Sequence, residues 1–145
     1  METIVIGCDN AAVSLKNTLK SFLEGKGYAV EDVGCDSRED PTMYPAIAER
    51  LCNRIIESGY TKRGVLVCGT GIGMSMVANK QKGIRAAACS DYFSAKFTRA
   101  HNDANVLCLG ERVIGSGLAC ELADVFLSTP FEGGKHQVRI DMFED

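Results

Sequence analysis

The sequence predicts an α/β protein of the three-layer α/β/α, Rossmann-like (flavodoxin-like) class, built on a five-stranded parallel sheet. Five short apolar runs alternate with segments of helical periodicity. Continuous apolar runs of this kind are typical of parallel strands that helices cover on both faces. The 145 residues allow a proper core but leave no room for a second unit, so a single domain over residues 1–145 is expected.

The first strand and helix follow from a change of periodicity. Residues 3–8 form a continuous apolar run, Thr3-Ile-Val-Ile-Gly-Cys8, which predicts a buried strand. Apolar residues then recur at three- and four-residue spacing from Val13 to Leu23, and Gly25 and Gly27 mark the end of the expected helix.

The remaining elements repeat this alternation. The further strands are expected at Tyr28–Val33, Gly64–Cys68, Ile84–Cys89 and Asn105–Leu109. The further helices are expected at Pro45–Ile56, Gly73–Asn79, Tyr92–Arg99 and Ser116–Leu127, with a last one over Gly133–Glu144.

Strand order predicts where a ligand binds. In open parallel sheets ligands bind beyond the carboxyl ends of the strands, at the point where the order reverses. With the flavodoxin-like order 2-1-3-4-5, that point lies between the first and third strands. These end in Cys8-Asp9-Asn10 and Cys68-Gly-Thr-Gly71, so two polar clusters are expected to meet in one crevice.

Composition excludes several classes. A net charge of −3 and a pI near 5.4 argue against a nucleic-acid partner, which favours a basic surface. No apolar run approaches the roughly 20 residues of a membrane span, and no secretory signal is visible at the start. A cytoplasmic protein without membrane contact is expected.

The seven cysteines form no CxxC pair, and the chain has two histidines, so neither a zinc cluster nor a disulfide framework is expected. Most lie in apolar runs, where buried free thiols are the ordinary outcome.

The stretch Val65-Leu-Val-Cys-Gly-Thr-Gly-Ile-Gly-Met-Ser75 fails each nucleotide or phosphatase motif. Met74 stands where the dinucleotide fingerprint needs glycine and where a phosphatase loop needs arginine, and no lysine completes a P-loop. What remains is a tight turn. Its N–H groups, from Gly69 to Ser75, either bind an anion or belong to a turn that is short only for close packing.

Cys68 at the start of this turn has two interpretations. N–H groups at a helix start stabilise a thiolate, which can act as a base in enolisation while the same groups hold the resulting oxyanion. A cysteine that ends a strand is, however, commonly inert.

Polar groups elsewhere have similar alternatives. His101 lies in a polar patch beside Asn102 and is either functional or a solvated cap. Lys135 and Arg139 share one helical face by their i,i+4 spacing, and Arg112 is a third cation. Each suits a phosphate group or a solvated surface.

Taken together, the chain resembles ribose-5-phosphate isomerase B and the galactose-6-phosphate isomerase subunits. The resemblance runs over nearly the whole sequence. The blocks that carry it are Cys68-Gly-Thr-Gly-Ile-Gly-Met-Ser75, Ala78-Asn-Lys80, Gly83-Ile-Arg-Ala86, His101-Asn-Asp-Ala-Asn-Val106, Gly110-Glu-Arg-Val-Ile-Gly115 and Phe131-Glu-Gly-Gly-Lys-His-Gln137.

This resemblance implies an aldose–ketose isomerase of phosphorylated sugars that needs neither metal nor cofactor. It implies that Cys68 moves a proton between C1 and C2 through an enediolate, with Thr70 beside it, while His101 and Asp9 assist ring opening. The implied substrate-binding residues are Asn10, Tyr44, Gly69, Gly71, Ile72, Gly73, Ser75, Asn102, Arg112, Lys135 and Arg139.

The resemblance also implies a homodimer, or two such dimers paired into a tetramer, with each active site between two subunits. The histidine and the C-terminal cations then reach across from one subunit to the other, so the last helix is expected to contact a partner.

Three positions depart from the ribose-phosphate pattern. Asn10 replaces a histidine, Lys135 an arginine, and Met43 a frequent aspartate. The catalytic set is retained while the contacts to phosphate and sugar are altered. The substrate expected is therefore either ribose 5-phosphate or another sugar phosphate, such as that of a tetrose, a hexose or an epimeric pentose.

Two other functions fit parts of the sequence. One is a sugar-phosphate or nucleotide sensor of flavodoxin-like fold without catalysis. The other makes Cys8, at the end of the first strand, a phospho-acceptor.

Overall fold

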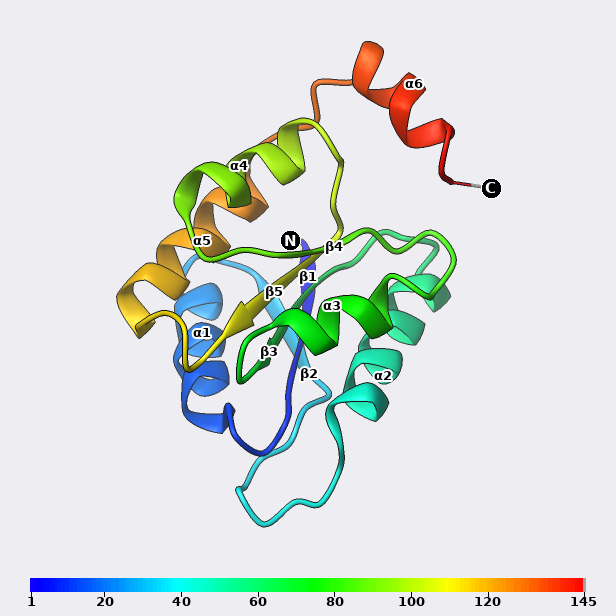
Figure 1. The fold of residues 1–145 in the computed structure, drawn as a ribbon. Helices are drawn as coiled ribbons and strands as arrows, with labels where there is room; N and C mark the ends of the chain where they lie inside the picture. Colours follow the sequence, from blue (N-terminus) through cyan, green and yellow to red (C-terminus); the bar gives the residue numbers. More distant parts are fainter. Residues whose placement is uncertain (145) are drawn as a thin grey trace.

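The computed structural model describes residues 1–144 and confirms the three-layer α/β fold (Figure 1). Its sheet has five strands, and every pairing between neighbours is parallel. The strands are β1 (Thr3–Cys8), β2 (Ala29–Asp32), β3 (Arg63–Cys68), β4 (Ala86–Ala88) and β5 (Val106–Gly110).

Helices cover both faces of this sheet, as the continuous apolar strands predicted. They are α1 (Val13–Gly25), α2 (Tyr44–Glu57), α3 (Ile72–Ala78), α4 (Tyr92–Ala100), α5 (Ser116–Ser128) and α6 (Lys135–Asp141). Helices α1 and α5 pack together on one face, where α4 lies against α5, and α2 packs with α3 on the other. Helix α6 extends away from the sheet at its upper edge in Figure 1.

The expected strand order 2-1-3-4-5 is wrong at its end, because the observed order is β2-β1-β3-β5-β4. All five residues of β5 are buried, whereas the three alanines of β4 are half-buried or exposed. Burial in the centre of the sheet stabilises the large apolar residues of β5 more than it would stabilise alanines, so β4 is the edge strand. The reversal between β1 and β3 is unaffected.

The segment after β2 is anchored by a buried lysine. Lys16 on α1 has no exposed surface, and its ammonium lies 2.9 Å from Asp32 Oδ2 and donates to Cys35 O at 2.6 Å. An ammonium buried in this way has to be paired, so these contacts hold the loop that leads into α2.

The cysteines are free, as expected, and six of the seven are buried while Cys120 is half-buried. Burial raises the pKa of Cys8 and of Cys52 to about 12 and that of Cys89 to about 11. Cys8 has no exposed surface, and its Sγ donates to Cys35 O at 3.4 Å. A thiol buried and hydrogen-bonded in this way is a poor nucleophile, which argues against Cys8 as a phospho-acceptor.

No helix in the described part of the chain is both long enough and apolar enough to span a membrane.

Candidate active site

The predicted crevice lies where β1 and β3 end side by side. Cys8 of β1 pairs with Val67 of β3, and Cys68 pairs with Gly110 of β5. We call this end of the sheet the cysteine edge and define it by a set of predicted residues that gather there. These are Asp9, Asn10, Tyr44, Cys68 to Gly73, Ser75 and Arg112.

Cys68 is held under its own loop. Its side chain is 6% exposed, and the Gly71 N–H donates to its Sγ at 3.1 Å. Gly71 has φ +81°, and a Cβ there would lie 3.0 Å from the Leu109 carbonyl carbon. Both the backbone conformation and the close packing on β5 require glycine at this position. The sulfur, which would have to accept a proton from a substrate, therefore already faces a fixed N–H donor.

Two hydroxyls follow Cys68, that of Thr70 in the loop and that of Ser75 on α3. The Ile72 N–H donates to Thr70 Oγ1 at 3.2 Å, and Ser75 Oγ donates to Ile72 O at 2.7 Å. Thr70 is exposed, in contrast to the thiol next to it. The loop therefore presents an accessible hydroxyl beside a shielded sulfur.

Tyr44 reaches the loop from α2. A Cβ built on Gly73 would lie 2.7 Å from the Tyr44 ring, so the ring packs directly on this glycine. Tyr44 also lines a cavity of about 300 Å³ together with Asp9, Asn10 and Met43. The carboxylate of Asp9 accepts the Ala11 N–H at 3.1 Å, which fixes the turn after β1.

A second cavity of about 420 Å³ opens between Asn10 and Arg112, with Arg38, Glu111 and Ala11 completing its lining. Two guanidinium groups and one carboxylate make it net positive, which suits an anion. Sequence reasoning missed Arg38, because an arginine in a polar loop carries no local signal of its position in the fold.

Two residues that line this cavity are held in place by hydrogen bonds, one of them to the residue after Cys68. The Arg112 N–H donates to Gly69 O at 3.0 Å, so Arg112 is anchored beside Cys68. Asn10 is also held, because its Nδ2 donates to Asp40 O at 3.0 Å.

Four predicted residues lie at the other end of the sheet. His101 and Asn102 follow α4 and precede the start of β5, while Lys135 and Arg139 belong to α6. The structure does not bring them to Cys68 within one chain. Cys68 pairs with Gly110 at the carboxyl end of β5, whereas His101 and Asn102 precede Val106 at its amino end. We call this end the histidine edge.

At the histidine edge, His101 stacks on His136, with ring centroids 4.1 Å apart and planes 9° from parallel. Glu132 Oε2 lies 3.7 Å from His101 Nε2, and Glu132 Oε1 lies 3.5 Å from His136 Nε2. The pKa of His136 is lowered, first by desolvation and then by electrostatic interaction with the neighbouring His101, so His136 stays neutral at pH 7.

These three side chains are also the metal-ligand candidates in the described part of the chain, since their donor atoms lie within 4.8 Å of one another. The two rings stack, however, and both Nε2 atoms lie within 3.7 Å of one Glu132 carboxylate, one at each of its oxygens. The arrangement therefore suits ring stacking and a shared carboxylate better than tetrahedral coordination. Glu132 was another residue that sequence reasoning missed.

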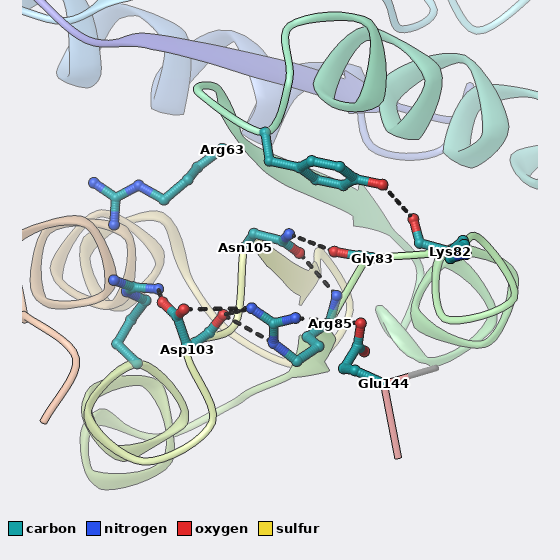
Figure 2. Close-up of a pocket in the computed structure, with 9 residues that line it drawn as sticks. Arg63, Lys82, Gly83, Arg85, Asp103, Asn105 and Glu144 are labelled. Carbon is teal, nitrogen blue, oxygen red and sulfur yellow. Dashed lines mark hydrogen bonds and ion pairs between the residues drawn. The ribbon is translucent and has the colours of Figure 1, made fainter. Parts of the chain in front are cut away.

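A further cavity of about 390 Å³ lies near the amino ends of β3 and β5 (Figure 2). It is lined mainly by arginines and carboxylates that pair with each other, as with Arg85 and Asp103. It contains no thiol and no imidazole. The cysteine edge, which holds the thiol, is therefore the candidate active site.

The sequence matches the Ribose/Galactose Isomerase family over residues 4–143. It is 45% identical over 141 residues to the D-erythrulose-4-phosphate isomerase of Pectobacterium atrosepticum, which covers 97% of this chain and 92% of that protein. It is 42% identical over 141 residues to the ribose-5-phosphate isomerase B of Escherichia coli, covering 97% of this chain and 93% of that protein.

The fold also matches solved structures. Ribose 5-phosphate isomerase from Thermotoga maritima superposes with a TM-score of 0.92 at 45% identity, covering 99% of this chain and 97% of that one.

Proposed function

This chain belongs to the ribose/galactose isomerase family, and from that premise we propose that it interconverts the aldose and ketose forms of a phosphorylated sugar. The observation that carries the proposal is the Cys68 thiol beneath a loop whose Gly71 N–H is directed at its sulfur. A shielded base beside fixed N–H donors is what enolisation requires.

The reaction proceeds through an enediolate. The Cys68 thiolate removes the proton from C2 of the open-chain aldose, and the electron pair moves onto the carbonyl oxygen at C1. N–H groups of the loop from Gly69 to Gly73 stabilise the negative charge that develops there. The thiol then returns the proton to C1, which gives the ketose. Thr70, which is exposed beside the sulfur, is positioned to exchange the proton on the substrate oxygens.

A complete site needs a second copy of the chain. His101, Asn102, Lys135 and Arg139 lie at the histidine edge, away from Cys68. In a dimer with two-fold symmetry, the histidine edge of each subunit faces the cysteine edge of the other. Exposed apolar side chains on α4 and next to α6, such as Phe93 at 71% and Phe143 at 62%, support such an interface.

The phosphate group is placed between cations of both subunits. Arg112 contributes from the cysteine edge, with Lys135 and Arg139 of the partner subunit closing over it. Asn10 is uncharged, and Lys135 offers a point charge in place of a planar fork. We therefore expect a sugar of four to six carbons, including the tetrose phosphates that one relative's name specifies.

The test is a panel of four-, five- and six-carbon aldose and ketose phosphates, assayed with the purified protein in deuterated water. A true substrate is isomerised and gains deuterium at C1 or C2. Binding of a sugar phosphate without isomerisation or exchange would favour the non-catalytic sensor and would reject the enzyme.

His101 is expected to matter only for substrates that close a ring. A pentose 5-phosphate aldose closes through its C4 hydroxyl, whereas its ketose and all tetrose 4-phosphates stay open. His101→Ala should lower kcat/KM for the cyclic aldose by about 10²- to 10⁴-fold, the range for lost acid–base catalysis. Deuterium exchange at C1 of an open ketose phosphate should fall less than about 3-fold. Equal losses in both assays would contradict the ring-opening role.

Gly110 is expected to fix the distance between β5 and the loop that carries Thr70. A Cβ at this position would lie 2.7 Å from the Thr70 backbone, so Gly110→Ala has to push the loop away from β5. A displacement near 1 Å should lower kcat by about 10²-fold. The control is Gly117→Ala on α5, where a Cβ meets nothing within 4 Å. Turnover by Gly110→Ala at the rate of this control would contradict the prediction.

A further inference from the structure

The segment that carries His101 and Asn102 ends in a strained residue. Asp103 has φ +47°, in the left-handed region that residues other than glycine rarely adopt. Such a conformation persists only where its surroundings hold it, and strain of this kind is common beside functional residues. The structure shows two arginines that do so.

Arg85, which leads into β4, binds the backbone of this segment. Its Nε donates to Asn102 O at 3.0 Å, and its NH2 group donates to Asp103 O at 2.9 Å. A second contact joins NH2 to Asp103 Oδ2 at 3.4 Å. These are carbonyls just past the end of α4, where a cation is also favoured by the helix dipole.

Arg99, on the last turn of α4, binds the other side of Asp103. Its NH1 group donates to Asp103 Oδ1 at 2.8 Å and to Ala104 O at 2.8 Å. The two arginines thus hold opposite oxygens of one carboxylate. Figure 2 shows Arg85 between Asp103 and Glu144 in the cavity near the amino ends of β3 and β5.

We propose that Arg85, Arg99 and Asp103 form a clamp that positions His101 and Asn102 for the site of the partner subunit. The inference rests on the proposed function, since it assigns those two residues to the substrate. None of the three clamp residues touches the substrate. They act by fixing the backbone from residue 101 to 104, so that the imidazole and the amide meet the sugar in one geometry.

Arg63 provides a matched control from the same cavity. Its side chain is 17% exposed against 20% for Arg85, and it is likewise paired, through Nε and NH2, with Glu2 at 2.7 Å. Its contacts go to the start of β1 and to Leu127 O, not to the His101 segment. Arg63→Gln therefore breaks an equivalent ion pair without loosening the clamp.

The first experiment compares Arg85→Gln with Arg63→Gln on the sugar phosphate that the panel identifies. We expect Arg85→Gln to lower kcat/KM by about 10- to 100-fold and Arg63→Gln by less than about 3-fold. Asp103→Asn tolerates positive φ and keeps one acceptor oxygen, so its loss of kcat/KM should lie between those of the two arginine variants. It provides a second test of the clamp in case Arg85→Gln misfolds. Equal losses for Arg85→Gln and Arg63→Gln would overturn the proposal.

The second experiment is a double-mutant cycle. Adding Arg85→Gln to a protein that already carries His101→Ala and Asn102→Ala should change kcat/KM by less than about 2-fold, because the clamped side chains are gone. An undiminished loss in that background would mean that Arg85 acts elsewhere and would overturn the proposal.

Amide hydrogen exchange separates the clamp from the proposed function. Amides 101–104 should exchange faster in Arg85→Gln than in Arg63→Gln, whether or not the wild-type protein isomerises any sugar phosphate. Unchanged exchange at these amides would reject the clamp itself. Absence of wild-type isomerisation would reject the proposed function instead.

Discussion

Replacing Cys68 with alanine is expected to lower kcat by about 10²- to 10⁴-fold, since it removes the proposed base that moves the proton between C1 and C2. The thiol contributes little to the cavities that hold the sugar and its phosphate, so calorimetry should show a Kd for the substrate within about 3-fold of wild type. Deuterium exchange at C1 should disappear together with isomerisation, because both begin with the same proton transfer.

Cys120→Ala is the control, because it removes a half-buried thiol on α5 that lines neither cavity of the cysteine edge. It should retain full turnover. If Cys68→Ala turned over substrate as fast as Cys120→Ala, another group would have to serve as the base and the proposed mechanism would be rejected.

Two inactive variants are expected to restore activity when they are mixed. The first is Cys68→Ala, and the second carries Lys135→Ala together with Arg139→Ala. Each homodimer has two defective sites. A mixed dimer has one site with all defects and one site with none, so unfolding and refolding an equimolar mixture should recover about a quarter of wild-type activity.

This recovery depends on the separation of the two edges in one chain. If Cys68 and the α6 cations served the same site from the same chain, every site in the mixture would carry a defect and no activity would return. Mixing each variant with itself under the same refolding conditions gives the baseline, and size-exclusion chromatography with light scattering gives the subunit count.

Much of the local structure could be predicted from the sequence. The strand β1 and the helix α1 begin where the periodicity predicted, because the pattern of burial along a strand or helix is a local property. The tight turn at Gly71 could be predicted as well, since alternating glycines mark positions that need positive φ or close packing.

The position of the last strands could not be predicted in the same way. The runs at β4 and β5 both read as parallel strands, and the order between them depends on which one gains more from a central position. That comparison involves the whole sheet, and the expected order placed them the wrong way round.

The candidate site shows the same division. The sequence by itself determined which reactive groups the chain carries: a cysteine at a strand end, a glycine turn after it, and a histidine with two cations elsewhere in the chain. The resemblance implied that His101 and the C-terminal cations act across subunits, and the tertiary structure places Cys68 at one end of the sheet and His101 at the other. The tertiary structure alone placed Arg38, Glu132 and Arg85. Residue type and local spacing specify what a group can do, whereas its neighbours are set by sheet topology and side-chain packing, which join residues far apart in the sequence.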